Sequence, residues 1–142
     1  MNNYFVYLAG GMTDFINTPD EMINWRLDVK DKLEHYKCDY KVKCFNPVEY
    51  YSLEDTTPEI EIEAMNYDLH KLKESNLVIV NFNAPKSLGT QSEIAIAWDN
   101  HIPIIGLNED ENILHSWQTG MTSKIFTDRE DMLAYVCNYY LN

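Results

Sequence analysis

Glu93 is the residue of this sequence whose setting most suggests chemistry. It lies in the stretch 87–98, SLGTQSEIAIAW, which follows the apolar run LVIVNF. A carboxylate that stays dry yet ionised beside the positive end of a helix is a plausible nucleophile. A structural role is equally open, because Thr90 and Glu93 match the S/T-x-x-E capping box, in which the glutamate accepts a hydrogen bond from the amide of the first residue.

Asp68, Tyr7 and Ser87 are further candidates, each with a simple structural alternative. Asp68 lies in MNYDLHKL, where an exposed ion pair with Lys71 would stabilise the helix by a few tenths of a kcal/mol. Tyr7 lies near the end of the apolar segment YFVYLA, where a tyrosine is often part of the core with its hydroxyl satisfied. Ser87 directly precedes the Glu93 helix, where a serine usually makes a loop hydrogen bond.

Metal and cofactor motifs are not found in the sequence. The four histidines form no His-Glu-x-x-His pattern. The three cysteines lack Cys-x-x-Cys spacing, which favours reduced thiols in a cytoplasm-like compartment. We therefore predict no metal, no cofactor and a cytoplasmic location.

The net charge limits the classes of partner that the protein can bind. The formal net charge is −12, whereas nucleic-acid polymers and anionic membranes both require clustered lysine and arginine. Arg26 and Arg129 are the only arginines, which argues against a bidentate arginine clamp. No run reaches the ~18 apolar residues of a membrane span, and the start of the chain has no signal-peptide pattern. We expect a soluble protein with a small-molecule ligand.

Hydrophobic periodicity predicts alternating strands and helices over one domain, 1–142. Strands are expected at 4–9, 40–45, 77–82 and 102–107, with a short one in 123–127. Helices are expected at 20–36, 58–75, 90–100 and 128–141. The residues expected to face inward are Met22, Trp25, Val29 and Leu33 in the first helix, and Ile62, Met65, Leu69 and Leu72 in the second.

The alternation of elements predicts an α/β fold, a three-layer sandwich with a five-stranded, mostly parallel sheet in the flavodoxin-like order 2-1-3-4-5. Ligands of such sheets bind above the carboxyl ends of the strands where the order reverses, here between the first and third strands. The loops 10–13 and 83–90 lie at that place. The candidate ligand-binding residues are therefore Gly10, Gly11, Met12, Ser87, Gly89 and Thr90.

Asp68 imposes a geometric condition on this arrangement. It lies about ten residues into its helix, ~15 Å from the helix start. The helix must therefore overhang the sheet or tilt towards the crevice if Asp68 is to reach a ligand there.

Three segments together resemble the nucleoside 2-deoxyribosyltransferase family, which also includes the 2′-deoxynucleoside 5′-monophosphate N-hydrolases. They are YLAGGMT, NYDLHKLKESNLVIVNF and SLGTQSEIAIAWDNHIPIIGL, and they span most of residues 4–107. The resemblance implies that Glu93 attacks the anomeric carbon of a deoxyribonucleoside and forms a covalent glycosyl-enzyme. It implies that Tyr7 positions Glu93, and that Asp68 serves as general acid or proton relay for the leaving base, as in retaining two-carboxylate chemistry.

Ser87 bears on the choice between transfer and hydrolysis. Six residues before the nucleophile the transferases commonly carry an aspartate, whereas a serine resembles the nucleotide hydrolases, where it helps to bind the 5′-phosphate. Amides of Ser87, Gly89 and Thr90 at a helix N-terminus would suit an anion, although the net charge of −12 opposes one. Deoxyribosyl transfer to a nucleobase is our first expectation. Hydrolysis of nucleoside 5′-monophosphates is the alternative, and a non-catalytic nucleotide-binding module is a third.

The resemblance also implies a homo-oligomer, because in this family a C-terminal residue of a neighbouring subunit completes the active site. Ser116, Thr122 and Ser123, in HSWQTGMTSKI, are the candidates, and we retain Ser123 among the substrate-binding residues. The tyrosines that could cover such an interface, or simply pack in the core, are Tyr135, Tyr139 and Tyr140.

Overall fold

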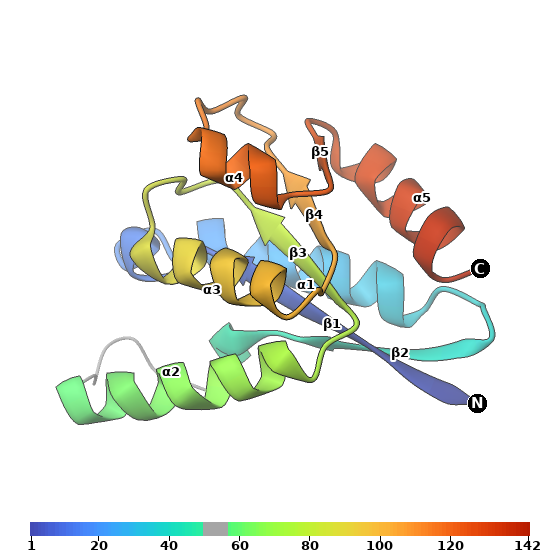
Figure 1. Ribbon diagram of the computed structural model, residues 1–142, viewed down its shortest axis with the longest axis horizontal. Helices are drawn as coiled ribbons and strands as arrows, with labels where there is room; N and C mark the ends of the chain where they lie inside the picture. The colour runs from blue at the N-terminus through green and yellow to red at the C-terminus, as the bar shows by residue number, and fades with distance from the viewer. Residues whose placement is uncertain (50–56) are drawn as a thin grey trace.

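The computed structural model describes residues 1–49 and 57–142 and has the predicted alternation of strands and helices (Figure 1). The strands are β1 (Asn2–Gly10), β2 (Tyr40–Phe45), β3 (Leu77–Asn81), β4 (Ile104–Leu107) and β5 (Lys124–Phe126). The helices are α1 (Asp20–Glu34), α2 (Pro58–Lys73), α3 (Leu88–Asp99), α4 (Ser116–Met121) and α5 (Arg129–Tyr140). Short 3₁₀ turns, η1 (Thr13–Phe15) and η2 (Pro47–Glu49), follow β1 and β2.

The sheet has the order β2-β1-β3-β4-β5, and each neighbouring pair is parallel. The predicted flavodoxin-like order is therefore confirmed. In the register, Tyr7 on β1 lies beside Phe45, the last residue of β2, and beside Val78 near the start of β3. The end of β2 thus stops short of the end of β1, which continues to Gly10.

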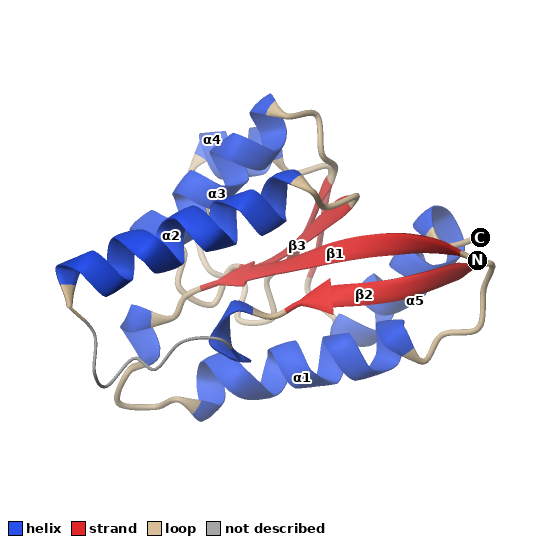
Figure 2. Ribbon diagram, turned by 90° about the horizontal axis from the view of Figure 1, so that it is seen from below, coloured by secondary structure: helices blue, strands red, loops and turns tan. Residues whose placement is uncertain are grey.

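Two helical layers cover the sheet (Figure 2). Alternate residues of β1 point to opposite faces, as the pleat of a strand requires. Val6 and Leu8 pack in the core beneath α1 and α5, whereas Tyr7 and Ala9 pack in the core beneath α2 and α3. This alternation decides which side chains can meet the residues of α3.

The predicted inward face of α1 is confirmed, and that of α2 is partly wrong. Leu72 is fully buried, but Ile62 and Met65 are 56% and 50% exposed. The reason is visible in Figure 2, where the first turns of α2 extend past the end of β1 and have no sheet beneath them. The apolar stripe of α2 therefore packs on the core only in its last turns.

The start of α3 also differs from the prediction. The helix begins at Leu88 rather than Thr90, because Ser87 is the N-cap and its side chain accepts a hydrogen bond from the amide of Thr90. Thr90 is consequently inside the first turn, not at the cap.

The segment before β5 contains a helix, α4, that was not among the helices predicted from the sequence. In α4 the side chain of His115 accepts from the amide of Trp117, while Gln118 accepts from the amide of His115. A histidine cap is an uncommon signal, and the helix is short, so periodicity does not find it.

Within the described ranges, the helices are all too short or too polar to cross a bilayer. The same ranges contain no cluster of three or more histidine, cysteine, aspartate or glutamate side chains suited to hold a metal ion.

Candidate active site

Tyr7 and Glu93 meet in the space between the sheet and α3. The hydroxyl of Tyr7 donates a hydrogen bond to Oε2 of Glu93. Tyr7 is fully buried, and its ring stacks on that of Phe45 at 5.4 Å between centroids. Tyr7 reaches Glu93 because odd-numbered residues at this end of β1 face α3. The structure therefore joins two side chains that are 86 positions apart in sequence.

Glu93 does not cap its helix, so the capping-box interpretation is wrong. Because α3 begins at Leu88, Glu93 lies in the second turn, beyond reach of the N-terminal amides. In a capping box Glu93 would accept a hydrogen bond from the amide of Thr90. That amide donates instead to the hydroxyl of Ser87. The carboxylate of Glu93 is thus left to interact with Tyr7 and with whatever occupies the space beside it.

Asp68 faces the same cluster from α2. Its charge raises the pKa of both Tyr7 and Glu93. Its Oδ1 atom is buried and has no hydrogen-bond partner within the described part of the chain. The alternative ion pair with Lys71 is not formed, and the Lys71 ammonium lies over the ring of Tyr67, 5.6 Å from its centroid. The first turns of α2 overhang the sheet, which is one of the two arrangements that the position of Asp68 required (Figure 2).

The two carboxyl groups have strongly perturbed pKa values. Burial raises the pKa of Glu93 to about 7, against the opposing effects of the Tyr7 hydrogen bond and the Arg26 charge. Burial raises the pKa of Asp68 to about 6, with Arg26 again opposing. Both groups therefore titrate near neutral pH, and Glu93 holds its proton more tightly than Asp68 does.

The N-terminus of α3 is not what favours the ionised form of Glu93, contrary to the expectation from the sequence. The field of a helix terminus decays within the first turn, and Glu93 lies in the second. Tyr7 and Arg26 take over this role. Burial also raises the pKa of Tyr7 well above its usual range, so its hydroxyl remains a neutral donor to Glu93.

Arg26 is a functional candidate that sequence analysis missed. Its side chain is fully buried, and it donates to the carbonyl oxygens of Met22 at 2.8 Å, Gly10 at 3.0 Å and Leu8 at 3.5 Å. Burial lowers its pKa to about 10, so it remains a cation at neutral pH. No carboxylate of the described residues forms an ion pair with it, and its charge acts on Glu93 and Asp68 from beneath β1.

A signal for Arg26 was present in the sequence. It occupies the apolar stripe of α1, directly beside Trp25 and four residues after Met22. A charged residue at such a position must be buried, and a buried charge needs compensation from other polar groups.

Gly10 and Gly11 are needed for space rather than for an unusual backbone conformation, since neither has a positive φ. A Cβ on Gly10 would lie 2.9 Å from the indole of Trp25, and one on Gly11 would lie 2.6 Å from the Cβ of Ala84. These glycines let the end of β1 pack closely against α1 and the loop after β3. Met12, which follows, is partly exposed, and its carbonyl accepts the amide of Phe15.

Ser87, Gly89 and Thr90 form the N-terminus of α3. The hydroxyl of Ser87 accepts from the amide of Thr90 at 3.4 Å and from its hydroxyl at 3.1 Å. Gly89 has open space where a Cβ would be. A cleft of about 350 Å³ lies near these loops, lined by Asp14, which follows the first loop, and by residues 84–86 of the second.

Ser123 is not brought together with the other candidates in a single chain. It is exposed and precedes β5, and its amide donates to the carbonyl of Ile104 at the start of β4. This places it at the start of the edge strand β5, which is separated from β1 by β3 and β4. Of the other two candidates, Thr122 is buried and its hydroxyl donates to the carbonyl of Gln118, whereas Ser116 is the exposed first residue of α4.

Tyr7, Asp68 and Glu93 do not line the cleft of about 350 Å³. Their cluster lies near the end of β2, since Tyr7 is paired with Phe45, the last residue of that strand.

Comparison with known proteins finds similarity in structure but not in sequence. No protein-family model and no curated protein matches the chain. A 2-deoxyribosyltransferase from Bacillus psychrosaccharolyticus superposes with a TM-score of 0.74 at 18% identity, covering 92% of this chain and 91% of that one. A 2-deoxyribosyltransferase from Leishmania mexicana gives a TM-score of 0.70 at 16% identity, covering 97% and 99%.

A CMP N-glycosidase from Clostridium botulinum is also similar, with a TM-score of 0.51 at 18% identity over 95% of this chain and 98% of that one. At these identities the likeness bears on the fold. The resemblance predicted from sequence is confirmed at that level: the chain has the fold of the nucleoside 2-deoxyribosyltransferases.

Proposed function

We propose that this chain is an enzyme that cleaves the N-glycosidic bond of 2′-deoxyribonucleosides and transfers the sugar to an acceptor nucleobase. The observation that carries the proposal is the hydrogen bond from Tyr7 to Glu93, with Asp68 and Arg26 acting on the same carboxylate. A partly buried carboxylate with one neutral donor, one nearby acid and one fixed cation matches the needs of a retaining glycosyl transfer.

In the first step an Oε atom of Glu93 attacks C1′ of the deoxyribose and forms an ester bond. The bond from C1′ to the base nitrogen breaks, and its electron pair goes to the base. Protonated Asp68 gives its proton to the departing base, either directly or by relay through an intervening polar group. The transition state carries positive charge on the sugar ring, which the ionised Glu93 stabilises.

In the second step a nitrogen of the acceptor base attacks C1′ and loses its proton to Asp68. The ester bond breaks, and Glu93 leaves as a carboxylate that accepts again from Tyr7. Each carboxyl group thus returns to its starting state. The reactive arrangement needs Glu93 ionised and Asp68 protonated, whereas the resting pKa values of about 7 and about 6 favour the proton on Glu93, so a proton must move to Asp68 before the attack.

Arg26 would act through Glu93 rather than on the substrate. It is enclosed beneath β1 and held by backbone carbonyls, so it has no path to the sugar. Its fixed charge lowers the pKa of Glu93, which keeps a larger fraction of the nucleophile ionised near neutral pH.

Hydrolysis of nucleoside 5′-monophosphates is the second candidate. It is favoured by the open N-terminus of α3, where Gly89 leaves the backbone accessible, and by Lys86 in the adjoining cleft. The CMP N-glycosidase is one of the proteins with a similar fold, although its TM-score is below those of the two transferases. A non-catalytic nucleotide-binding module remains a third candidate.

We further propose that a second copy of the chain completes the site. Ile62 and Met65 lie on the overhanging part of α2, one to two turns before Asp68, and both are at least half exposed. Apolar side chains beside a site that opens at a helix overhang favour coverage by another subunit. The expected result is a dimer or larger species in size-exclusion chromatography, and a monomer at assay concentration would contradict it.

One assay separates the candidate reactions. The chain is incubated with deoxycytidine, deoxyadenosine and their 5′-monophosphates, with and without a free acceptor base, and products are separated by liquid chromatography. Sugar transfer that requires the acceptor supports the transferase. Base release from monophosphates alone supports the hydrolase. Absence of turnover with thermal stabilisation by a nucleotide would replace both with a binding module.

A further inference from the structure

Two cysteines that are far apart in the sequence lie on neighbouring segments of the α1 and α5 face. Cys38 is in the connection between α1 and β2, and Cys137 is in the last turn of α5. Both side chains are partly buried, and both pack against the core that α1 and α5 cover. Cys44 on β2 differs from them, because it belongs to that core and is only 5% exposed. Two of the three thiols are therefore open to solvent and close to each other.

Other contacts hold these two segments together. The hydroxyl of Tyr36 donates a hydrogen bond to Oδ1 of Asn142 at 3.1 Å. Leu141, the preceding residue, is buried in the same core. The end of α5 lies beside the connection that leads into β2 in both views (Figures 1 and 2). The neighbouring position of the two cysteines is thus fixed by the fold around them.

The two thiols also interact electrostatically. Burial raises the pKa of Cys137, and the charge of Cys38 raises it further. Charges at a partly exposed site act on each other only over about 10 Å, so the two sulfur atoms are close. The thiol of Cys38 donates to the carbonyl oxygen of Tyr40 at 3.5 Å, which keeps it at the start of β2. The charged groups that act on the pKa of Cys44 are instead Glu34 and Lys30.

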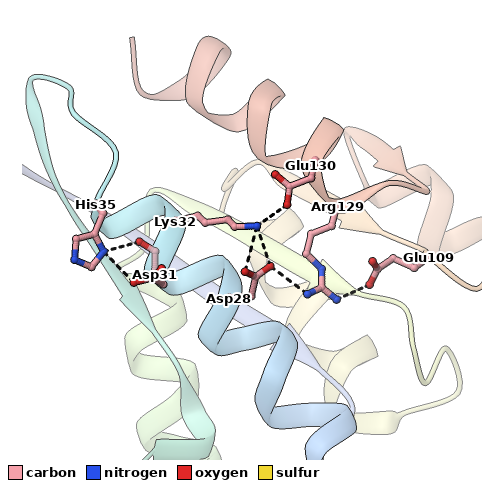
Figure 3. A network of polar contacts seen from close by, with 7 residues as sticks. All are labelled: Asp28, Asp31, Lys32, His35, Glu109, Arg129 and Glu130. Atoms are coloured by element: carbon pink, nitrogen blue, oxygen red, sulfur yellow. Dashed lines mark hydrogen bonds and ion pairs between the residues drawn. The ribbon is translucent and has the colours of Figure 1, made fainter.

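The two ends of α5 are fastened differently. Among the described residues, the ion pairs between α1 and α5 all involve the first turn of α5, where Arg129 contacts Asp28 and Glu130 contacts Lys32 (Figure 3). The last turn has the exposed hydrogen bond of Tyr36 instead. A covalent bond at Cys137 would therefore fasten the end of the helix that the ion pairs leave alone.

We propose that Cys38 and Cys137 form a reversible disulfide that locks the end of α5 onto the connection before β2. The oxidant would be a small disulfide of the glutathione type. The thiolate of one cysteine attacks a sulfur of the oxidant, whose S–S bond breaks and releases one small thiolate. The second cysteine loses its proton to solvent and attacks the protein sulfur of this mixed disulfide, which releases the second small thiolate. Both cysteines are thus oxidised, and one small disulfide is reduced to two thiols.

The disulfide would act on stability and not on the proposed chemistry. It would close a loop of about 100 residues, which restricts the unfolded chain strongly. It would also lie at the far end of β2 from the candidate active site, since Cys38 precedes that strand and Phe45, beside Tyr7, ends it. This inference does not rest on the proposed function.

Oxidation of the full chain with excess oxidised glutathione tests the proposal. Free thiols are then alkylated under denaturing conditions, and the peptides are identified by mass spectrometry. The expected product is one Cys38–Cys137 disulfide within a single chain, with Cys44 alkylated and no glutathione retained. Its Tm should exceed that of the reduced chain by at least about 5 °C, and a reducing agent should abolish the difference.

Three variants, each compared with its own reduced form, assign the bond. Cys38→Ser and Cys137→Ser should lose the rise in Tm and should retain one glutathione on the remaining partner. Cys44→Ala is the matched control and should form the disulfide with the same rise. Three alkylatable thiols in the oxidised wild type, glutathione retained on Cys38 or Cys137, or a bond between two copies would each overturn the proposal. A Cys38–Cys137 bond that leaves Tm unchanged would overturn the lock.

Discussion

The two faces of the sheet use charge in different ways. Between the sheet and α2 and α3, Tyr7, Asp68 and Glu93 are crowded together, and both carboxyl groups titrate far above their usual range. On the face of α1 and α5, Asp28 bridges Lys32 and Arg129, so that each charge has an opposite neighbour (Figure 3). The first arrangement leaves charge poorly compensated, whereas the second neutralises it at the surface.

This difference separates chemistry from ordinary surface design. Crowded, partly buried carboxyl groups destabilise the folded state, and folded proteins retain them mainly where a reaction needs their altered pKa values. Paired charges at the surface cost little and contribute little. If the distinction is correct, substitutions on the α2–α3 face will change activity strongly, and those in the α1–α5 network will not.

Glu93→Gln should have the largest effect. The amide retains the shape of the side chain and can still accept from Tyr7, but it cannot form the ester to the sugar. We expect at least a ~100-fold loss in rate, measured as base release by chromatography. Glu130→Gln, a matched change in the surface network, is the control and should retain full rate. Unchanged activity in Glu93→Gln would remove the proposed mechanism.

Arg26→Met should have the second-largest effect, because it removes the buried cation that lowers the pKa values of Glu93 and Asp68. It leaves the carbonyls of Met22 and Gly10 without their donor, and we expect a loss of about 2 kcal/mol in the free energy of unfolding. The acidic limb of the pH–rate profile should move to higher pH by about one unit, since Glu93 then ionises less readily.

Arg26→Lys distinguishes these two effects. The lysine keeps the charge but cannot reach the same set of carbonyls, so stability should fall while the acidic limb moves less than in Arg26→Met. An unshifted profile in Arg26→Met would show that this cation has no influence on the nucleophile.

Tyr7→Phe should have a smaller effect on the same carboxylate. The hydroxyl is a donor to Oε2 of Glu93, and a donor to the ionised form lowers the pKa. We expect a roughly 10-fold loss of rate at pH 7 that is partly recovered at pH 8, where Glu93 ionises without help. Tyr139→Phe, an exposed tyrosine of α5, is the control. A pH-independent loss would show that the hydroxyl of Tyr7 does not act through the pKa of Glu93.

Much of the fold was predictable from the sequence because the apolar periods of the strands and of α1 match their buried faces. The overhang of α2 was not, because Ile62 and Met65 have helical spacing whether or not anything covers them. The helix α4 was missed because it is short and begins with a histidine cap.

The candidate site was predictable in its members but not in its electrostatics. Resemblance and topology together indicated Tyr7, Asp68 and Glu93. The capping-box pattern gave a competing role to Glu93, and only the position of the true N-cap, Ser87, removes it. Arg26 was missed although it is a charged residue on an apolar stripe. Its partners are backbone carbonyls, which no sequence pattern identifies.

The stability of the chain should carry a pH signature of the crowded carboxylates. The folded-state pKa of Glu93 is about 7, above the ordinary value of 4.5, so the folded state binds the proton more tightly than the unfolded state. This contribution is fully present below pH 4.5 and is lost as the pH rises through 7. Glu93→Gln should therefore exceed the wild type by about 1–2 kcal/mol at pH 8 and match it near pH 4.5, measured by urea unfolding. A gap that does not change with pH would contradict the raised pKa.

Lys32→Ala should have the smallest effect, and this result bears on the comparison of the two faces. Lys32 lies 3.2 Å from Asp28 and also contacts Glu130, with 42% of its side chain exposed. At such exposure solvent and salt screen the attraction, and ordering two long side chains offsets part of it, so we expect no measurable change in the free energy of unfolding. Arg129 would still hold Asp28, so the network would reorganise rather than expose a lone charge. A clear loss of stability that persists in about 1 M salt would mean that this face also holds functional or structural charge, and the distinction drawn between the two faces would fail.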